Sequence, residues 1–370
     1  MKEINIPPAT AIGSLPINDD QQALKLVFKH LPGFPHWPQQ PRLGPKAGMI
    51  DQFVHPLLKM GLIKDRGHNS YYFPTEAPEW EERMLSFFNL YLSLEEGEEE
   101  VLENFSLPEQ YFPGFYSFME EMKARAPDKA QVVKGQVTGP LAVGIQLKDE
   151  QGRDAYYHPQ LREVIVKTVC LQARWQAFRL SELGLPVLIN IDDPGISTFG
   201  SSTYITISRE DIQSSLQEVI DHLHQQQALA GLHSCAGADW SIPLELNLDL
   251  LSFDAYGYFN SLIGYPEEIN QFLKEGGYLA WGIVPSSQEA MDFSSQQLFE
   301  LLLERMEILV SKGVDEDRLW QQMVITPSCG AGTLPEETAA RIYGLTAELR
   351  EIFIDKRASR GGREQGCQPI

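Results

Sequence analysis

Hydrophobic and polar positions follow two different rhythms from about residue 130 onward. Short runs rich in β-branched residues are typical of buried strands, and longer stretches with an apolar side chain every three or four positions are typical of amphipathic helices. Their alternation predicts consecutive βα units that build a parallel sheet. The predicted strands are 132–139, 187–194, 230–235, 249–256, 278–284 and 323–330, and the predicted helices are 159–184, 209–231, 294–313 and 335–353.

Two further strands are predicted near the N-terminus, at 10–16 and 33–38, with a helical stretch at 18–31 between them. With the six later strands they make eight, the number that closes a (β/α)8 TIM barrel, so we expect an α/β fold of this class. The segment of about 39–130 is far longer than an ordinary connection. We interpret it as a helical insertion between the second and third strands.

Size and composition fit one globular domain. The 370 residues are 43% hydrophobic and 22% charged, which is ordinary for a soluble enzyme with a large core. We expect a single barrel domain over 1–355. The segment 356–370 is basic, contains glycine and lacks periodicity, so we expect a disordered tail there.

The net charge and the number of cysteines limit the kinds of binding partner and the cellular compartment that we expect. A formal net charge of −21 opposes binding to a phosphate backbone, so no nucleic-acid partner is expected. No apolar run approaches the roughly 20 residues of a membrane helix, and the N-terminus has no signal-peptide pattern, so we expect a cytoplasmic protein without a membrane partner. Four cysteines in so long a chain form no disulfide framework, and a special cysteine is then a metal ligand or a nucleophile.

Polar side chains gather where the predicted strands end. In parallel barrels the loops after the strands converge over the mouth, and chemistry collects there. Strand ends are also generally more polar than strand interiors, so the grouping has a purely structural interpretation as well. The strand-end residues are Ser14, His36, Thr138, Asp192, Asp193, His233, Cys235, Asp254 and Cys329.

Three of these residues suit a metal ion. His233 and Cys235 stand two positions apart and share one face of a strand, and Cys329 ends another strand. Zinc favours imidazole and thiolate ligands in a tetrahedron, so these residues are a candidate zinc site. A His-x-Cys pair alone is weak evidence, because buried histidine and cysteine neighbours are common.

An oxygen ligand is the expected fourth. A catalytic zinc keeps one displaceable position, and Asp254 at the next strand end is the preferred candidate, with Asp239 and Glu245 as rivals on the intervening loop. Two thiolates make zinc poor at generating hydroxide but suited to holding one more thiolate. Coordination deprotonates a bound thiol, which predicts an activated sulfur nucleophile that attacks an alkyl group.

The same residues carry a resemblance to a known family. The chain resembles the zinc-dependent methyltransferase domain of cobalamin-independent methionine synthase, within the uroporphyrinogen decarboxylase-like barrels. The matching blocks follow the family's order along the chain: "AIGSLP", "KGQVTGPLAV", "INIDDP" where the family has D-E-P, "LHSC", "DLLSFD" and "ITPSCG".

The resemblance implies a zinc-dependent S-methyltransferase in which a thiol, homocysteine in the first place, receives a methyl group to give methionine. His233, Cys235 and Cys329 would hold the zinc, and Asp254 would stand where the family has a glutamate ligand. Among the other residues, Ser14, Asp192 and Thr138 would bind the substrate, with Asp192 or Asp193 meeting its amino group in the catalytic site.

Departures from the family concern the methyl donor. The family's second, N-terminal barrel has no counterpart in 370 residues, and Ser286 and Ser287 stand where the family has an acid histidine. A methyl-corrinoid, whose cobalt leaves without much proton delivery, therefore competes with methyltetrahydrofolate as the donor. His36 and Trp37 in "GFPHWPQQP" are candidates for a donor cleft, although a tryptophan between prolines equally fits packing.

Three other functions remain open at this stage. A metal-free decarboxylase of the uroporphyrinogen type shares the barrel, but it would need basic residues for a polycarboxylate, and the strand ends carry few. A corrinoid or coenzyme-thiol methyltransferase would use the same zinc with another mercaptan. A non-catalytic zinc-binding module would keep four strong ligands, and only three are evident here.

Overall fold

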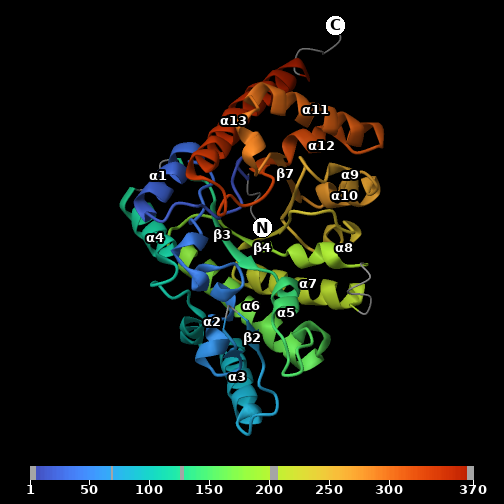
Figure 1. The fold of residues 1–370 in the computed structure, drawn as a ribbon. Coiled ribbons are helices and arrows are strands. Elements are labelled where there is room, and N and C mark those ends of the chain that lie inside the picture. The colour runs from blue at the N-terminus through green and yellow to red at the C-terminus, as the bar shows by residue number, and fades with distance from the viewer. Residues whose placement is uncertain (1–5, 68–69, 126–128, 201–206, 365–370) are drawn as a thin grey trace.

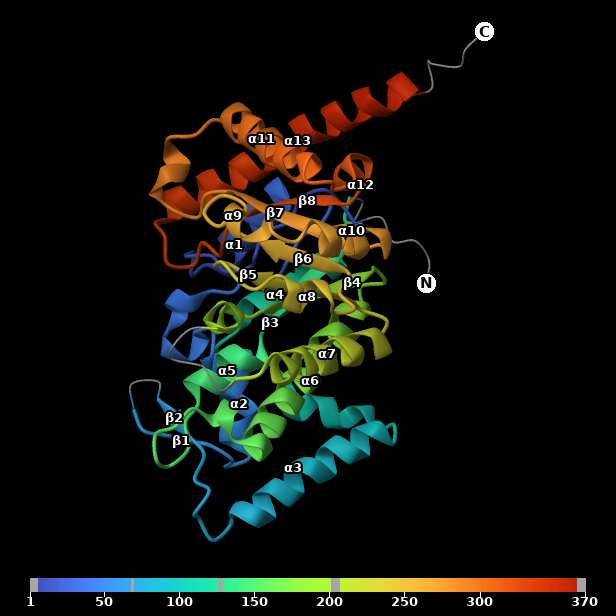
Figure 2. The same cartoon turned by 90° about the vertical axis from the view of Figure 1, so that its right-hand side faces the viewer.

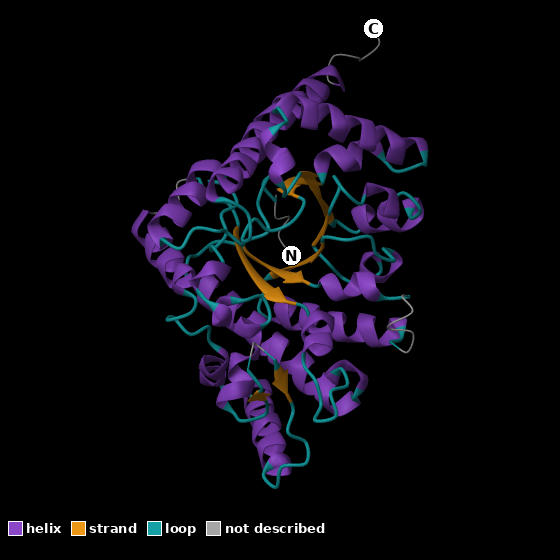
Figure 3. Ribbon diagram, viewed as in Figure 1, coloured by secondary structure: helices purple, strands orange, loops and turns teal. Residues whose placement is uncertain are grey.

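A computed structural model describes residues 6–67, 70–125, 129–200 and 207–364. Its centre is a six-stranded parallel sheet whose strands are neighbours in chain order (Figure 3). The strands are β3 (Val133–Thr138), β4 (Val187–Asp192), β5 (Leu229–Ser234), β6 (Leu250–Phe253), β7 (Tyr278–Val284) and β8 (Met323–Pro327). The fold is therefore of the mixed α/β kind, as the alternating pattern predicts.

Helices lie outside the strands and cover the curved sheet (Figure 1). Parallel neighbours require crossover connections, and the chain provides helices for them. Serine caps start two of these helices: Ser208 accepts from the backbone N–H of Asp211, and Ser294 forms a capping box with Gln297. The helices of this region are α5 (Pro140–Gln146), α6 (Pro159–Ser181), α7 (Arg209–Gln225), α8 (Ser241–Leu244), α9 (Phe259–Leu262), α10 (Pro266–Lys274), α11 (Ser295–Ser311), α12 (Glu316–Gln321) and α13 (Glu336–Glu364), with 3-10 helices η4 (Ala155–Tyr157), η5 (Pro194–Thr198) and η6 (Gln288–Met291).

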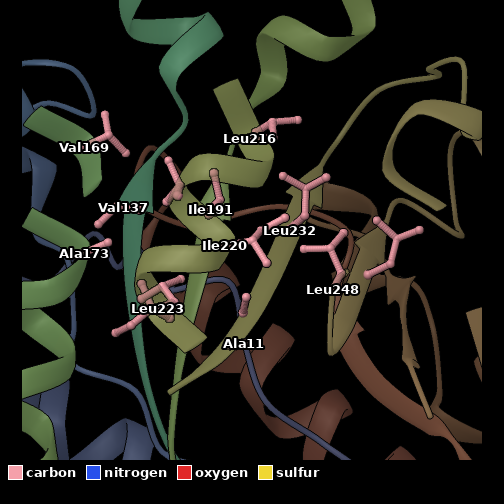
Figure 4. Close-up of a cluster of buried hydrophobic side chains, with 14 of the residues drawn as sticks. Ala11, Val137, Val169, Ala173, Ile191, Leu216, Ile220, Leu223, Leu232 and Leu248 are labelled. Atoms are coloured by element: carbon pink, nitrogen blue, oxygen red, sulfur yellow. The ribbon is translucent and has the colours of Figure 1, made fainter. Parts of the chain in front are cut away.

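Both faces of the sheet are buried. Val137, Ile191 and Leu232 from adjacent strands face α6 and α7, where Ile220 and Leu223 lie (Figure 4). A separate cluster on the other face takes one buried residue from or next to each of the six strands and one from each N-terminal segment. Its members are Ile6, Phe34, Val132, Leu188, Leu229, Leu250, Ala280 and Val324.

The two predicted N-terminal strands form single bridges in place of ladders. Parallel bridges join Ala9 to Ile325 of β8, His36 to Lys134 of β3, and Ser14 to Gln39. Each bridge has two backbone hydrogen bonds, and α1 (Asp20–His30) connects the two segments. Pro7 and Pro8 precede the bridge at Ala9, and Pro35 and Pro38 flank the bridge at His36. Proline has no N–H to donate, which explains why the pairing with the edge strands stays short.

The segment 39–130 contains its own helices and a small hairpin. Figure 2 shows α3 as a long outer arm at the far end of the molecule from α13. The helix α2 and the 3-10 helix η3 pack against α6. The elements are η1 (Pro41–Leu43), η2 (Pro45–Ala47), α2 (Asp51–Lys59), the antiparallel β1 (Lys64–Asp65) and β2 (Tyr71–Tyr72), α3 (Trp80–Glu95), η3 (Glu99–Phe105) and α4 (Pro113–Arg125).

The C-terminal helix is longer than the sequence predicts. It continues to Glu364, so the described part of the expected disordered tail is helical, and residues 365–370 lie outside the described residues. Arg360 explains part of this extension, because its guanidinium lies 5.0 Å from the ring centre of Trp320 and 2.7 Å from the carboxylate of Glu316. Throughout the described residues, every helix is too short or too polar to cross a membrane.

Candidate metal centre

Three metal-ligand side chains converge at the carboxyl ends of β5 and β8. His233 is in β5, Cys235 follows that strand directly, and Cys329 lies two residues beyond β8. One donor atom from each lies within 4.8 Å of the other two. Donors on one tetrahedral ion with bonds of about 2.0–2.3 Å are separated by roughly 3.3–3.8 Å, so a small adjustment brings the three around a single cation.

The His233 imidazole has one paired nitrogen and one unpaired nitrogen. Its Nδ1 lies 2.9 Å from Oγ of Ser252, which is its neighbour across the β5–β6 ladder. Its Nε2 is buried and has no hydrogen-bond partner among the described residues. Buried polar atoms are nearly always paired, so an unpaired nitrogen beside two thiols fits a metal ligand whose ion is not part of the structure. In that case Nδ1–H donates to Ser252 and fixes the tautomer.

The two cysteines form a coupled pair. The neighbouring Cys329 thiol and the nearby imidazole of His233 lower the pKa of Cys235. The hydrogen bond to Cys235, together with burial, raises the pKa of Cys329. A thiolate at Cys235 thus leaves Cys329 protonated in the absence of a cation. A bound cation provides the charge that lets both sulfurs be thiolates.

Ser286 fixes the backbone of Cys329. Its hydroxyl accepts from the Cys329 N–H at 2.9 Å and donates to the Cys329 carbonyl at 2.6 Å, and its own N–H donates to Oγ of Ser328. Sequence reasoning noted this serine only as a substitute for a histidine. Its local signal was weak, because the two residues are far apart in the chain and meet only where β7 and β8 pair.

A cavity of about 380 Å³ lies beside the three ligands. Its other polar lining residues are Ser14, Gln39, Gln52, Asp192 and Thr333. The apolar part of its wall consists of Ile12, Pro41, Ala47, Met49 and Pro194. A small thiol substrate fits this volume with its sulfur at the ligands and its carbon atoms on the apolar wall.

Asp192 is the carboxylate of the cavity, and Lys134 is the cation nearby. The Asp192 carboxylate accepts from Nδ2 of Asn190 at 2.6 Å, and burial raises its pKa although Lys134 and His233 oppose the shift. Lys134 is fully buried, donates to the carbonyl of Ile12 at 2.6 Å, and has its pKa lowered by burial to about 8. Sequence reasoning missed Lys134, although a lysine within a strand that is buried along its whole length was the available signal.

Ser14 also lies where a substrate-binding residue is expected. It lines the cavity, and its Oγ accepts from the backbone N–H of Gly332 at 3.2 Å. The loop after β8 passes so close that a Cβ on Gly330 would overlap Oγ of Ser14. Glycine at this position therefore permits the contact between the N-terminal segment and the cysteine loop.

Four of the predicted site residues do not line the cavity and have structural partners. Asp193 is fully buried and accepts backbone N–H bonds from Leu141, Ala142 and Gly195 at 2.9–3.0 Å, so it fixes two loops. Thr138 donates to the carbonyl of Met49 at 2.7 Å and thereby anchors the segment 39–130. Both residues therefore have structural contacts, and their expected substrate and catalytic roles stay predictions.

His36 and Trp37 likewise belong to the core. His36 is fully buried, with Nδ1 at 2.9 Å from the Trp37 carbonyl and Nε2 at 2.8 Å from the hydroxyl of Tyr343. Trp37 is also fully buried and donates to Oε1 of Gln176 at 3.0 Å. Neither residue lines the cavity and both have internal partners, so their part in a donor cleft stays a prediction.

The candidate oxygen ligands lie outside the three-residue group. Asp254 accepts from the Gly257 N–H at 2.6 Å, and burial raises its pKa, while the charges of His233 and Cys235 also act on it. Glu245 is paired with Arg209 at 2.7 Å. Asp239 accepts from the Ser241 hydroxyl at 2.5 Å. The charges of His233 and Cys235 act on the carboxylate of Asp254, which keeps it the first candidate for an oxygen ligand.

A second group of potential ligands already has internal partners. Cys170, Glu218 and His222 place their donor atoms within 4.8 Å of one another between α6 and α7. However, Nε2 of His222 lies 2.9 Å from the Tyr91 hydroxyl, and Lys167 pairs with Glu218 at 2.8 Å. We interpret this group as a buried polar network between α6 and α7.

Comparisons with known proteins identify no relative. A scan against protein-family models gives no match to this chain. A search of curated proteins finds none with significant similarity.

Proposed function

We propose that this protein is a zinc-dependent methyltransferase that activates a thiol substrate, with homocysteine as the first candidate. The observation that carries the proposal is the convergence of His233, Cys235 and Cys329, with an unpaired, buried Nε2, at the edge of a cavity. Two sulfurs and one imidazole are a donor set that zinc prefers, and three protein ligands leave a position for substrate.

We also propose that the fold is a (β/α)8 barrel in which the site occupies the mouth. The N-terminal segments bridge to β8, to β3 and to each other, which supports closure of the sheet. The separate eight-residue apolar cluster supports it too, because it takes one residue from each of eight successive positions around the sheet. The ligands lie at the carboxyl ends of the strands, where such barrels hold their active sites.

The protein residues have distinct roles in this proposal. Zinc, when bound, supplies the positive charge that keeps a thiol deprotonated near neutral pH. Ser252 orients the imidazole of His233, and Ser286 fixes the Cys329 loop. The apolar wall excludes water from the reacting sulfur. Asp254, close enough for its charge to act on His233 and Cys235, is the residue that would fill the fourth position before a substrate arrives.

In the transfer step a sulfur–carbon bond forms and the bond between the methyl carbon and its donor breaks. The thiolate supplies the electron pair of the new bond, and the electron pair of the old bond leaves with the donor. The thiol proton departs to solvent when the substrate binds. No redox partner is needed.

A methyl-corrinoid is the favoured donor. The Ser286 hydroxyl forms hydrogen bonds with both the N–H and the carbonyl of Cys329. Because its proton is already donated to that carbonyl, this hydroxyl is a poor acid for a leaving group. A cobalt leaving group needs little proton delivery, whereas the nitrogen of methyltetrahydrofolate needs an acid.

An assay with two donors tests the function. Zinc-loaded protein is incubated with homocysteine and either methylcobalamin or methyltetrahydrofolate, and methionine is quantified by mass spectrometry. We expect methionine from methylcobalamin, and loss of at least about a hundredfold of that rate in Cys329→Ser, since removal of a metal ligand disables the site. Absence of methionine from both donors in a zinc-loaded protein would overturn the proposal.

A further inference from the structure

The segment 39–130 supplies one wall of the cavity. Its first part, through η1, η2 and the start of α2, contributes Gln39, Pro41, Ala47, Met49 and Gln52 to the lining. Of these, Gln52 is the polar side chain carried by a helix, and it is 1% exposed. The lining of the cavity therefore contains a buried amide whose position is set by α2.

The amide of Gln52 is held at one end and unpaired at the other. Its Nε2 donates to the carbonyl of Met49 at 3.3 Å, while its Oε1 has no partner among the described residues. The backbone is held as well, because its carbonyl accepts from Nε2 of Gln172 and its N–H donates to the Gly48 carbonyl, both at 3.3 Å. A buried carbonyl oxygen without a donor, on a side chain that lines a cavity, is ready to accept a hydrogen bond from a ligand.

The charges of the lining favour a cationic group on that ligand. Asp192 contributes a carboxylate, and no lysine or arginine occurs among the described residues that line the cavity. The nearby Lys134 is occupied by the Ile12 carbonyl and by Oε1 of Gln136. An ammonium group has three N–H donors, which match acceptors such as Gln52 and Asp192, whereas a second anion would find few donors.

We propose that Gln52 is a specificity-determining residue that accepts a hydrogen bond from the amino group of an aminothiol substrate. This inference rests on the proposed thiol-binding function and names the feature of the thiol that the site selects. Asp192 supplies the opposite charge, and Gln52 supplies a neutral acceptor from the other wall. Thiols with an anionic group and no amine bind less tightly.

Binding of thiols to the cobalt-substituted protein tests this role without catalysis. The Co²⁺ absorption bands change when a thiolate joins the ligand set, so a titration yields a Kd for each thiol. The probes are homocysteine, 3-aminopropane-1-thiol, which lacks the carboxylate, and 4-mercaptobutyrate, which lacks the amine. We expect the wild type to bind both amine-bearing thiols more tightly than 4-mercaptobutyrate.

Gln52→Met replaces the amide with an apolar chain of similar length. This substitution should raise the Kd of both amine-bearing thiols roughly tenfold, which is the effect of losing one hydrogen bond to a charged group. The Kd of 4-mercaptobutyrate should stay unchanged. Gln52→Glu keeps an acceptor oxygen, and it should retain the preference for the amine. Met49→Leu is the matched control, since it alters the same wall without a polar atom and should not change the order of the three thiols.

Three results would overturn the inference. An equal increase in the Kd of all three thiols in Gln52→Met would show that Gln52 has only a packing role. No change in either Gln52 variant would show that the oxygen is not used. A wild type that binds Co²⁺ but no thiol would refute the proposed function itself and the inference with it, so the two failures are distinguishable.

Discussion

The imidazole of His233 depends on a single hydroxyl for its orientation. Ser252 provides that hydroxyl, and its Oγ lies 2.9 Å from Nδ1. The other ring nitrogen, Nε2, then remains available as a metal ligand beside Cys235 and Cys329. Partners of this kind typically contribute a factor of about 10–100 to metal affinity. The site is therefore expected to be sensitive to a residue that does not touch the metal.

Ser252→Ala should lower zinc affinity by about 10–100-fold, because the imidazole loses the partner that fixes its tautomer and ring orientation. Affinity is measured by competition with a chromophoric chelator. Ser234→Ala is the control, since that neighbouring hydroxyl is also buried but has no partner among the described residues, and its affinity should stay near wild type. Equal zinc affinity in Ser252→Ala and wild type would show that Ser252 does not orient the metal-binding imidazole.

The structure brings the three predicted metal ligands together, whereas the predicted substrate residues divide between the cavity lining and the core. His233, Cys235 and Cys329 were recognisable because thiols and imidazole are unusual at three strand ends. His36 and Asp193 carry equally polar groups at strand ends, yet their partners are a tyrosine 307 residues away and the backbone of another loop. Such partners leave no local pattern, so a buried structural group looks the same as a catalytic one.

At the scale of elements, Asp193 joins the starts of α5 and η5. Its two carboxylate oxygens accept from Leu141, Ala142 and Gly195. Burial raises its pKa to about 7, against the effect of these three N–H bonds. Pro194 at the start of η5 lines the cavity, so this carboxylate stabilises one part of the frame of the site.

Asp193→Asn should destabilise the protein by about 2 kcal/mol, because an amide NH₂ replaces one acceptor oxygen and leaves a buried N–H unpaired. Urea unfolding at pH 8, where the carboxylate is ionised, measures the free energy of unfolding. Asp315→Asn is the control, since this exposed N-cap of α12 accepts from Arg318 and asparagine caps equally well. A change below about 0.5 kcal/mol in Asp193→Asn would contradict the structural role.

The regular elements were largely predictable, and the irregular ones were not. Five of the six later strands fall within the predicted ranges, and β5 begins one residue before its range, since their apolar runs reflect burial on both faces. The two N-terminal segments form single bridges, because the prolines beside them cannot donate hydrogen bonds. Helix α13 continues past residue 353, because Arg360 contacts an aromatic and an acidic side chain on α12. Partners on other elements decided both outcomes.

At the scale of the whole molecule, His36 connects the first and last parts of the chain. It bonds Trp37 near β3 and Tyr343 in α13, and burial and Lys134 lower its pKa from 6.5 to about 3. The folded state therefore keeps this imidazole neutral over a range in which the unfolded state binds a proton. Stability from this group is present above pH 6.5 and is lost as pH falls toward 3.

The difference in pH dependence between wild type and His36→Gln isolates this contribution. Wild type should lose up to about 1.4 kcal/mol more per pH unit than the variant between pH 6.5 and 4, measured by urea unfolding with a chelator present so that metal loss does not contribute. The exposed His158→Gln should keep the wild-type slope. Parallel curves for wild type and His36→Gln would show that the buried imidazole titrates normally.

The central claim is that His233, Cys235 and Cys329 bind one metal ion, and X-ray absorption at the zinc edge tests it most directly. Protein produced with zinc should contain one equivalent, with two sulfur neighbours at about 2.3 Å and nitrogen or oxygen neighbours at about 2.0–2.1 Å. Cys329→Ser should lose one sulfur from that shell, and Cys170→Ala should keep both. A protein that stays metal-free with zinc supplied, or a zinc shell without sulfur, would contradict the account.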